Sequence, residues 1–132
     1  MAHERVKRAE MEFLNSRVVD MKMTEKMHGD VLVMSLTGNL IGEPESSELR
    51  NRIYGLLEKG TRKVVLDLAD LKVINSMGLG VLVASLTSIR NRGGDLCLAR
   101  LSDKVEGVLT LTQLIRVIKT YDSVERAVRG FR

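Results

Sequence analysis

The chain has 132 residues, 44% of them hydrophobic and 29% charged, and a formal net charge of +4 at pH 7. This size and composition are typical of one soluble globular domain, and no apolar run approaches the roughly 18 residues that a membrane-spanning helix needs. The single cysteine, Cys97, excludes an internal disulfide, and the first residues lack the apolar region of a secretory signal, so we expect a cytoplasmic protein.

Composition also argues against two kinds of site. Two histidines and one cysteine do not supply the soft ligands of a metal cluster, so we expect neither a metal nor a cofactor. Acidic and basic residues are interspersed through most of the chain, which has two Tyr, two Phe and no Trp. Nucleic-acid binding usually needs a basic face with stacking aromatic residues, and we therefore do not expect it.

The predicted elements begin with an N-terminal extension, residues 1–20, ahead of a domain that covers residues 21–132. Residues 2–19 are predicted to be helical, because apolar residues such as Phe13 and Leu14 are spread among charged ones. Two interpretations stay open: a partly ordered terminus, or a helix that docks on a partner or on a second copy of the chain, forming a homodimer.

A hairpin and a helix follow the extension. Residues 21–27 alternate weakly, His28-Gly29-Asp30 is a turn signal, and residues 31–36 form a stronger strand, which predicts an antiparallel pair. Pro44 lies near the start of a helix that ends at Gly60. The buried stripe of this helix consists of Leu49, Ile53, Leu56 and Leu57.

The next stretch, residues 64–89, contains the central strand and helix of the domain. Residues 64–69 form a mostly apolar run that opens with β-branched residues, which suits a strand buried on both faces. Asn75 and Ser76 then favour the start of a helix, since both are good N-cap residues. The apolar stripe of this helix consists of Leu79, Leu82, Val83, Leu86 and Ile89.

The last part of the chain repeats this alternation. After a stop signal at residues 91–94, residues 95–101 are predicted to form a strand, residues 114–120 a last strand and residues 124–131 a closing helix. The helix between the two strands is expected to have Ser102 or Asp103 as its cap and apolar positions at Val105, Val108, Leu109 and Leu111.

The resulting order is β-β-α-β-α-β-α-β-α. It predicts a single α/β domain in which a mixed, mainly parallel sheet is packed with about four helices, plus the helical extension. Right-handed crossovers place the loops that follow the parallel strands at one edge of the sheet. Loops at that edge usually carry the function of α/β proteins.

The motif after the central strand reads Asn75-Ser76-Met77-Gly78-Leu79-Gly80-Val81-Leu82. It resembles the signature of STAS domains, in which a strand ends in a pattern like Asp-Ser-Ser/Thr-Gly-Leu-Gly-Val-Leu and a helix follows. The resemblance extends from about Asp30 to Val128 and covers most of the chain. It implies the STAS fold, a sheet with helices packed on it, and the function of an anti-sigma factor antagonist, which is a binding module and not an enzyme.

The resemblance also implies a partner switch. In this family the unphosphorylated antagonist docks on an anti-sigma factor with a histidine-kinase-like ATPase fold and frees the sigma factor. The same kinase then phosphorylates a Ser or Thr at the helix start, which ends the docking, and a phosphatase of the PP2C type removes the phosphate. A phosphate adds about −1.5 to −2 charges at neutral pH, enough to break an interface that has no room for it.

The chain departs from the family pattern at two positions. Asn75 replaces the usual acidic residue and removes a charge near the site, and Met77 stands where some antagonists have the acceptor hydroxyl. Ser76 matches the acceptor position of other members and is the phosphoacceptor candidate. The alternative is that Ser76 is only an N-cap, in which case the chain binds its partner without an off-switch.

A loop is expected to begin at residue 37, and the predicted docking surface combines the helix start at residues 76–80 with the part of this connection at residues 38–44. Met77 and Leu79 are candidate contact residues, since methionine adapts to partner surfaces, but a core position is favoured for Leu79. Both glycines are expected to be structural. Asp67 is expected either to hydrogen-bond the loop or to be an exposed carboxylate. The partner-binding residues predicted in this way are Asn75, Ser76, Met77, Gly78, Leu79, Gly80, Asn39 and Glu43.

Two other functions compete with this interpretation. A nucleotide-binding enzyme is disfavoured, because Val83 occupies the place of the third small residue of a dinucleotide fingerprint, and neither His3 nor His28 has a catalytic context. The second competitor keeps the fold, as a STAS subunit of a lipid-transport ATPase complex or a STAS interaction protein that is not phosphorylated. Fold alone does not decide between these roles.

Overall fold

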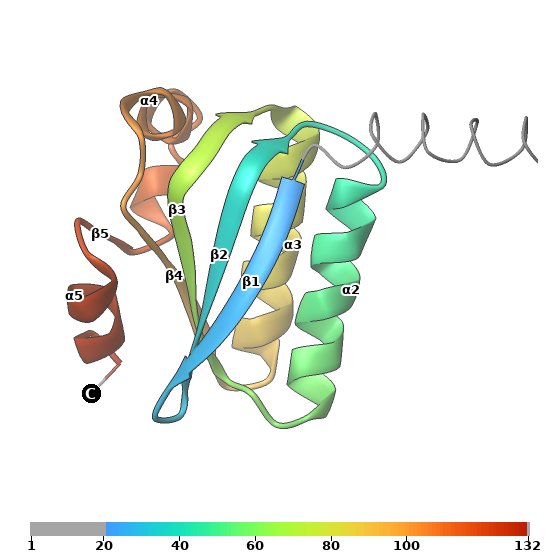
Figure 1. Ribbon diagram of the computed structural model, residues 1–132, viewed down its shortest axis with the longest axis vertical. Helices are drawn as coiled ribbons and strands as arrows, with labels where there is room; N and C mark the ends of the chain where they lie inside the picture. Colours follow the sequence, from blue (N-terminus) through green and yellow to red (C-terminus); the bar gives the residue numbers. More distant parts are fainter. Residues whose placement is uncertain (1–20, 132) are drawn as a thin grey trace, which may run out of the picture.

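The computed structural model describes residues 21–131, so the helix predicted within residues 1–20 lies outside the described part of the chain. Strands and helices alternate as predicted from the sequence (Figure 1). In chain order they are β1 (Met21–His28), β2 (Val31–Leu40), α2 (Glu45–Glu58), β3 (Lys63–Ile74), α3 (Ser76–Asn91), β4 (Asp95–Ala99), α4 (Asp103–Leu111), the 3-10 helix η1 (Leu114–Arg116), β5 (Thr120–Tyr121) and α5 (Val124–Arg129).

The strands form one five-stranded sheet in the order β1-β2-β3-β4-β5. β1 pairs antiparallel with β2, and the other neighbouring strands are parallel, which confirms the mixed, mainly parallel sheet. Met34 is in register with Leu66, and Leu66 with Leu98, so these three residues face the same side of the sheet. The parallel strands therefore end toward one edge, where β2 and β3 reach the top of Figure 1.

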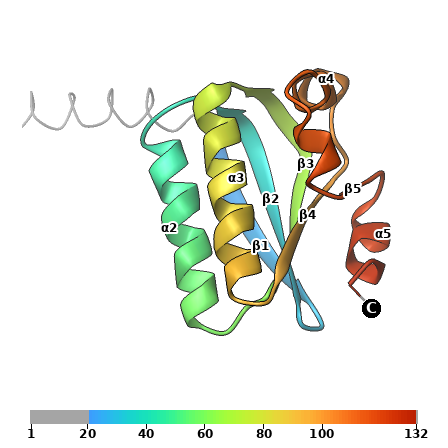
Figure 2. The same ribbon diagram turned by 180° about the vertical axis from the view of Figure 1, so that it is seen from behind.

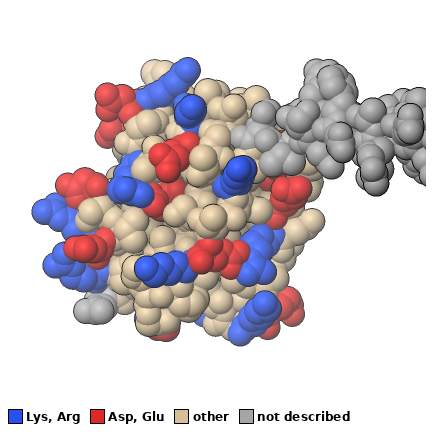
Figure 3. All heavy atoms as spheres, viewed as in Figure 1, with Lys and Arg blue, Asp and Glu red and all other residues tan. Residues whose placement is uncertain are grey.

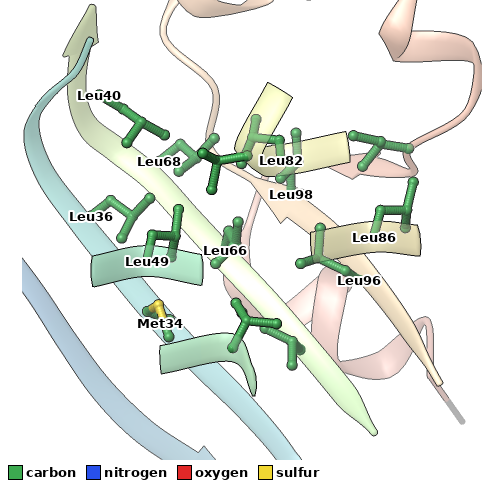
Figure 4. Close-up of a cluster of buried hydrophobic side chains, with 14 of the residues drawn as sticks. Met34, Leu36, Leu40, Leu49, Leu66, Leu68, Leu82, Leu86, Leu96 and Leu98 are labelled. Carbon is green, nitrogen blue, oxygen red and sulfur yellow. The ribbon is translucent and has the colours of Figure 1, made fainter. Parts of the chain in front are cut away.

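The two faces of the sheet are covered differently. Helices α2 and α3 lie on one face (Figure 2), and their apolar stripes pack with alternate residues of the strands into the main core. Labelled members of this core are Met34, Leu36, Leu40, Leu49, Leu66, Leu68, Leu82, Leu86, Leu96 and Leu98 (Figure 4). On the other face, a smaller cluster joins α5 to the strands and includes Val65, Cys97 and Val128.

Two strands are longer than predicted from the sequence. β3 continues to Ile74, and β2 continues to Leu40 where a loop was expected from residue 37. The register between them shifts from Ser35 to Thr37 and again from Gly38 to Asn39, which marks irregular pairing. Gly38 has a φ of 109°, a conformation that is easy for glycine and strained for other residues, so β2 stays paired with β3 through this irregularity.

The prediction of a strand at residues 114–120 is wrong for most of this segment. Leu114–Arg116 form the 3-10 helix, and the strand consists of Thr120–Tyr121 alone. The Val117 and Ile118 amides both donate to the Leu114 carbonyl, at 3.0 and 3.1 Å. Local turns therefore satisfy the backbone here and bury Ile118, which is 1% exposed.

Other predictions need smaller corrections. The closing helix ends at Arg129, two residues before its predicted end. Val83 and Leu111, which the sequence pattern placed on buried stripes, are 37% and 86% exposed. No helix within residues 21–131 is long and apolar enough to cross a bilayer. On the face that Figure 3 shows, acidic and basic side chains are interspersed.

Candidate functional site

The structure brings together the two segments that the sequence analysis assigned to the site. β2 and β3 end side by side, with Leu40 in register with Ile74. The Asn75 side chain then connects them, because its Nδ2 donates to the Ile41 carbonyl at 2.7 Å. The start of α3 and the segment after Leu40 are therefore adjacent.

Asn75, and not Ser76, is the N-cap of α3. The Asn75 Oδ1 accepts a hydrogen bond from the Gly78 amide at 3.1 Å, in the usual geometry of a capping side chain. Ser76 is the first residue of the helix and is exposed. Its hydroxyl has no hydrogen-bond partner among the described residues, so the interpretation of Ser76 as a plain cap is wrong.

The two glycines of the motif have different roles. A Cβ at Gly78 would collide with the Leu40 carbonyl oxygen and lie 2.8 Å from the Ile74 side chain, so the helix start can pack against β2 only with glycine here. A Cβ at Gly80 would meet nothing within 4 Å. The expectation that both glycines are structural is therefore correct for Gly78 and wrong for Gly80.

The remaining predicted contact residues divide into surface and core. Met77 is 48% exposed, whereas Leu79 is 8% exposed and belongs to the main core, which confirms the placement favoured from the sequence over a contact role. Asn39 is half-buried near the end of β2. Glu43 is exposed, and its carboxylate accepts a hydrogen bond from the Ser47 amide at 3.2 Å, which helps to satisfy the first turn of α2.

The start of α3 has no charged side chain of its own, although Glu43 lies exposed in the segment after β2. No Asp, Glu, Lys or Arg occurs between Lys72 and Arg90, a stretch that includes nearly all of α3. The side chain that joins the two segments is the amide of Asn75, where the family pattern has an acid. An anion at the start of α3 would therefore meet helix N–H groups and the positive end of the helix dipole, and no charged side chain from the helix itself.

Asp67 lies on the other face of the sheet and has partners that the sequence analysis missed. Its carboxylate receives two hydrogen bonds from Arg100, at 2.9 and 2.6 Å, and one from Ser35 at 3.2 Å. Burial would raise the pKa of Asp67, but these hydrogen bonds, the Ala69 amide and the Arg100 charge lower it below its ordinary value. Asp67 is 5% exposed, so both sequence-based interpretations of this residue are wrong.

Arg100 could not be paired with Asp67 from the sequence alone. The two residues are 33 positions apart, and the pairing depends on the register that places Asp67 beside Ala99. Arg100 also has a φ of 56°, an unusual conformation for a non-glycine residue, directly after β4. The ion pair connects the turn between β4 and α4 to the central strand.

Two further observations concern the buried thiol and possible metal ligands. Burial, and to a smaller extent Asp95, raises the pKa of the Cys97 thiol to about 12, so this thiol is not a nucleophile at neutral pH. Within residues 21–131, no three His, Cys, Asp or Glu side chains gather in a way that could hold a metal ion.

Comparisons with known proteins agree with this arrangement. The family model described as STAS domain matches residues 22–127. A protein of Thermotoga maritima named as a candidate anti-sigma factor antagonist is 43% identical over 76 residues, which are 58% of this chain and 67% of the relative. BtrV of Bordetella bronchiseptica, named in the same way, is 29% identical over 112 residues, which are 85% of this chain and 96% of BtrV.

Solved structures extend the similarity to the fold. The crystal structure of a candidate anti-sigma factor antagonist from Thermotoga maritima has a TM-score of 0.73 at 33% identity and covers 82% of this chain and 92% of that one. SpoIIAA of Bacillus in its phosphorylated form has a TM-score of 0.67 at 18% identity, with 84% and 100% of the two chains covered. The second similarity concerns the fold alone.

Proposed function

The chain belongs to the STAS domain family and to its anti-sigma factor antagonist type, and from this we propose that it acts in the cytoplasm by docking on an anti-sigma factor with a histidine-kinase-like ATPase fold. The docking releases the sigma factor. The protein acts by binding and not by catalysis. Phosphorylation of Ser76 by the anti-sigma factor ends the docking, and a phosphatase of the PP2C type restores it.

The observation that carries the proposal is the free hydroxyl of Ser76 at an exposed helix start. Asn75 already caps α3, and within residues 21–131 the Ser76 hydroxyl has no hydrogen bond that modification would break. A phosphate on the first helical residue is stabilised by the helix dipole, so the modified helix stays folded. The modification therefore changes the surface of the domain and leaves its fold in place.

The neutral character of the site explains how the phosphate would act. The uncharged start of α3 suits a partner surface that is also uncharged at this point, because neither side has to lose a strongly hydrated ion there on binding. Phosphorylation introduces about −1.5 to −2 charges into the middle of that surface. Burying these charges against a neutral partner is unfavourable, so the complex dissociates.

An affinity pull-down from native lysate with ADP or ATP tests the proposal. We expect a kinase-fold ATPase to be retained with ADP and lost with ATP, with phosphate on the Val73–Arg90 tryptic peptide at Ser76. The same ATPase retained in both conditions without modification would identify an antagonist that is not phosphorylated. Subunits of a transport ATPase in its place would contradict the proposal and favour the lipid-transport alternative.

Two variants of one size separate charge from shape at Ser76. We expect Ser76→Asp to weaken the complex at least tenfold, because it places a carboxylate at the helix start. Ser76→Asn has the same size without the charge and should retain most of the affinity. Ser76→Ala cannot be phosphorylated and should retain the ATPase with ADP and with ATP alike. Equal binding by the Asp and Asn variants would remove the electrostatic switch.

A further inference from the structure

The start of α3 is too small to be a complete docking surface. Of its residues, Gly78 and Leu79 are buried, which leaves Asn75, Ser76, Met77 and Gly80 on the surface. A stable protein–protein interface of standard size uses about 20–30 residues on each side. The docking surface therefore continues onto a neighbouring element, and the neighbours differ in charge.

Helix α3 presents an uncharged outer face, and α2, the other long helix within residues 21–131, does not. Between Lys72 and Arg90 every residue is neutral, so α3 is without charged side chains until its last turn. The outer face of α2, which lies beside α3 in Figure 2, carries the exposed residues Glu48, Arg50 and Glu58. If an apolar partner surface bound on α2, these charged side chains would lose their hydration, which is unfavourable. Binding on α3 carries no such cost before its last turn.

Exposed apolar side chains also gather along α3. Met77 and Val83 on the helix are 48% and 37% exposed, and Ile41 at the adjoining segment is 38% exposed. The Asn75 Nδ2 donates to the Ile41 carbonyl at 2.7 Å, so an uncharged side chain connects this segment to the helix start. Exposed apolar side chains thus occur from Ile41, at the start of the segment after β2, to the middle of α3, and the nearest exposed charge in that segment is Glu43.

Gly80 lies between Met77 and Val83 on this face, and nothing in the domain requires it to be glycine. A Cβ there would meet no atom within 4 Å, yet glycine in a helix interior is less favourable than alanine. A residue without a side chain lets a second backbone approach closely. Because no described part of the domain approaches Gly80, the element that does so would come from outside the domain. The open glycine of α4, Gly107, is flanked instead by Lys104 and Glu106.

We propose that the docking surface continues along α3 from Ile41 and Met77 through Gly80 to Val83 and Thr87, and that it binds one helix of the kinase-type anti-sigma factor through an uncharged apolar face. We call this surface the α3 strip. The partner helix comes closest at Gly80. Ser76 to Thr87 rise about 16 Å along the helix, so roughly three turns of a partner helix pack on the strip. This inference rests on the proposed function and extends the surface assigned there.

The first test uses two glycine variants, Gly80→Ala and Gly107→Ala. Both positions are helical, exposed and open, so each variant should raise the Tm by about 3 °C. Gly80→Ala should nevertheless weaken binding of the ATPase recovered with ADP about tenfold, whereas Gly107→Ala should not change it. A stabilised Gly80→Ala protein that binds as tightly as the unmodified chain would overturn the inference.

A second pair of variants tests how far the strip extends. Thr87 and Thr110 are both exposed, and each hydroxyl donates to the carbonyl four residues earlier, at 2.9 and 2.8 Å. Arginine at either position faces solvent in the free protein, so neither variant should unfold it. We expect Thr87→Arg to reduce the affinity at least tenfold and Thr110→Arg to have no effect.

The same measurements separate failure of the strip from failure of the proposed function. Loss of binding in Ser76→Asp, with full binding in Gly80→Ala and Thr87→Arg, would leave the function intact and overturn the strip. If no kinase-fold ATPase binds the unmodified chain, the proposed function itself fails. Sedimentation of the unmodified protein as a dimer that Thr87→Arg makes monomeric would assign the strip to a second copy of the chain and overturn the inference.

Discussion

At the junction between β3 and α3 the chain passes from strand to helix through Asn75, and at the junction between β4 and α4 it does so through Arg100 and Ser102. Each helix has a polar cap, since Asn75 accepts from the Gly78 amide at 3.1 Å and Ser102 from the Val105 amide at 3.2 Å. At the first junction, the neutral side-chain amide of Asn75 donates to the Ile41 carbonyl in the segment after β2. At the second, Arg100 forms an ion pair with Asp67 of β3.

The difference follows from what each junction faces. The Arg100–Asp67 pair lies beside the α5 face of the sheet, and half of the Arg100 side chain is exposed, so its charge keeps part of its hydration. A similar ion pair at the start of α3 would lie within the proposed docking surface and would lose its hydration when the partner binds. A neutral amide connects the two segments there without that desolvation.

The largest effect should come from the packing of the neutral junction. Gly78→Ala forces a methyl group against the Leu40 carbonyl, and we expect a loss of about 3 kcal/mol in the free energy of unfolding. Urea unfolding measures this value. Gly80→Ala, two residues later on the same helix, is the control and should stabilise. A Gly78→Ala protein as stable as the unmodified one would show that the close contact with β2 is absent.

The charged junction should be next in size. Arg100→Ala leaves the Asp67 carboxylate buried with only Ser35 and the Ala69 amide as partners, and we expect a loss of about 2 kcal/mol at pH 7. The exposed pair of Arg129 and Glu125, 3.9 Å apart, provides the control. Arg129→Ala should change the stability by less than about 0.5 kcal/mol.

The pH dependence of stability provides a separate test of the same ion pair. The pKa of Asp67 is lower in the folded than in the unfolded chain, so its contribution is complete above the unfolded value of about 3.9. That contribution is lost as the pH falls through the folded pKa. The stability difference between the unmodified chain and Asp67→Asn, measured by urea unfolding, should therefore shrink below about pH 4. A constant difference down to pH 3 would contradict the lowered pKa.

The smallest effect should come from the connecting amide. Asn75→Asp retains an acceptor for the Gly78 amide but loses the donor to the Ile41 carbonyl, and we expect a loss of about 1 kcal/mol. Asn75→Ala removes both hydrogen bonds and should be more destabilising than Ser102→Ala, which removes one. If the two alanine variants unfold at the same urea concentration, the Asn75–Ile41 hydrogen bond contributes nothing to stability.

Much of the fold was predictable because it depends on local pattern. The apolar run at residues 64–69 and the helical spacing of Leu79, Leu82 and Leu86 identified the central strand and helix, and both are confirmed. The segment at residues 114–120 was mispredicted because a short apolar run fits a strand or a turn of helix equally well. There, Leu114–Arg116 form a turn of 3-10 helix, and Ile118 after it is buried in the main core.

The sequence by itself determined the α/β alternation, the family and the motif that begins at Asn75, because strand and helix periodicity, caps and glycines act over a few residues. Tertiary structure decided which polar group has which partner. Only the register of β2, β3 and β4 brings Asp67 to Arg100 and Asn75 to Ile41, since both pairs are more than 30 residues apart. The same packing buries Leu79 and Gly78 and leaves Ser76 and Gly80 on the surface, because one face of α3 must cover the sheet.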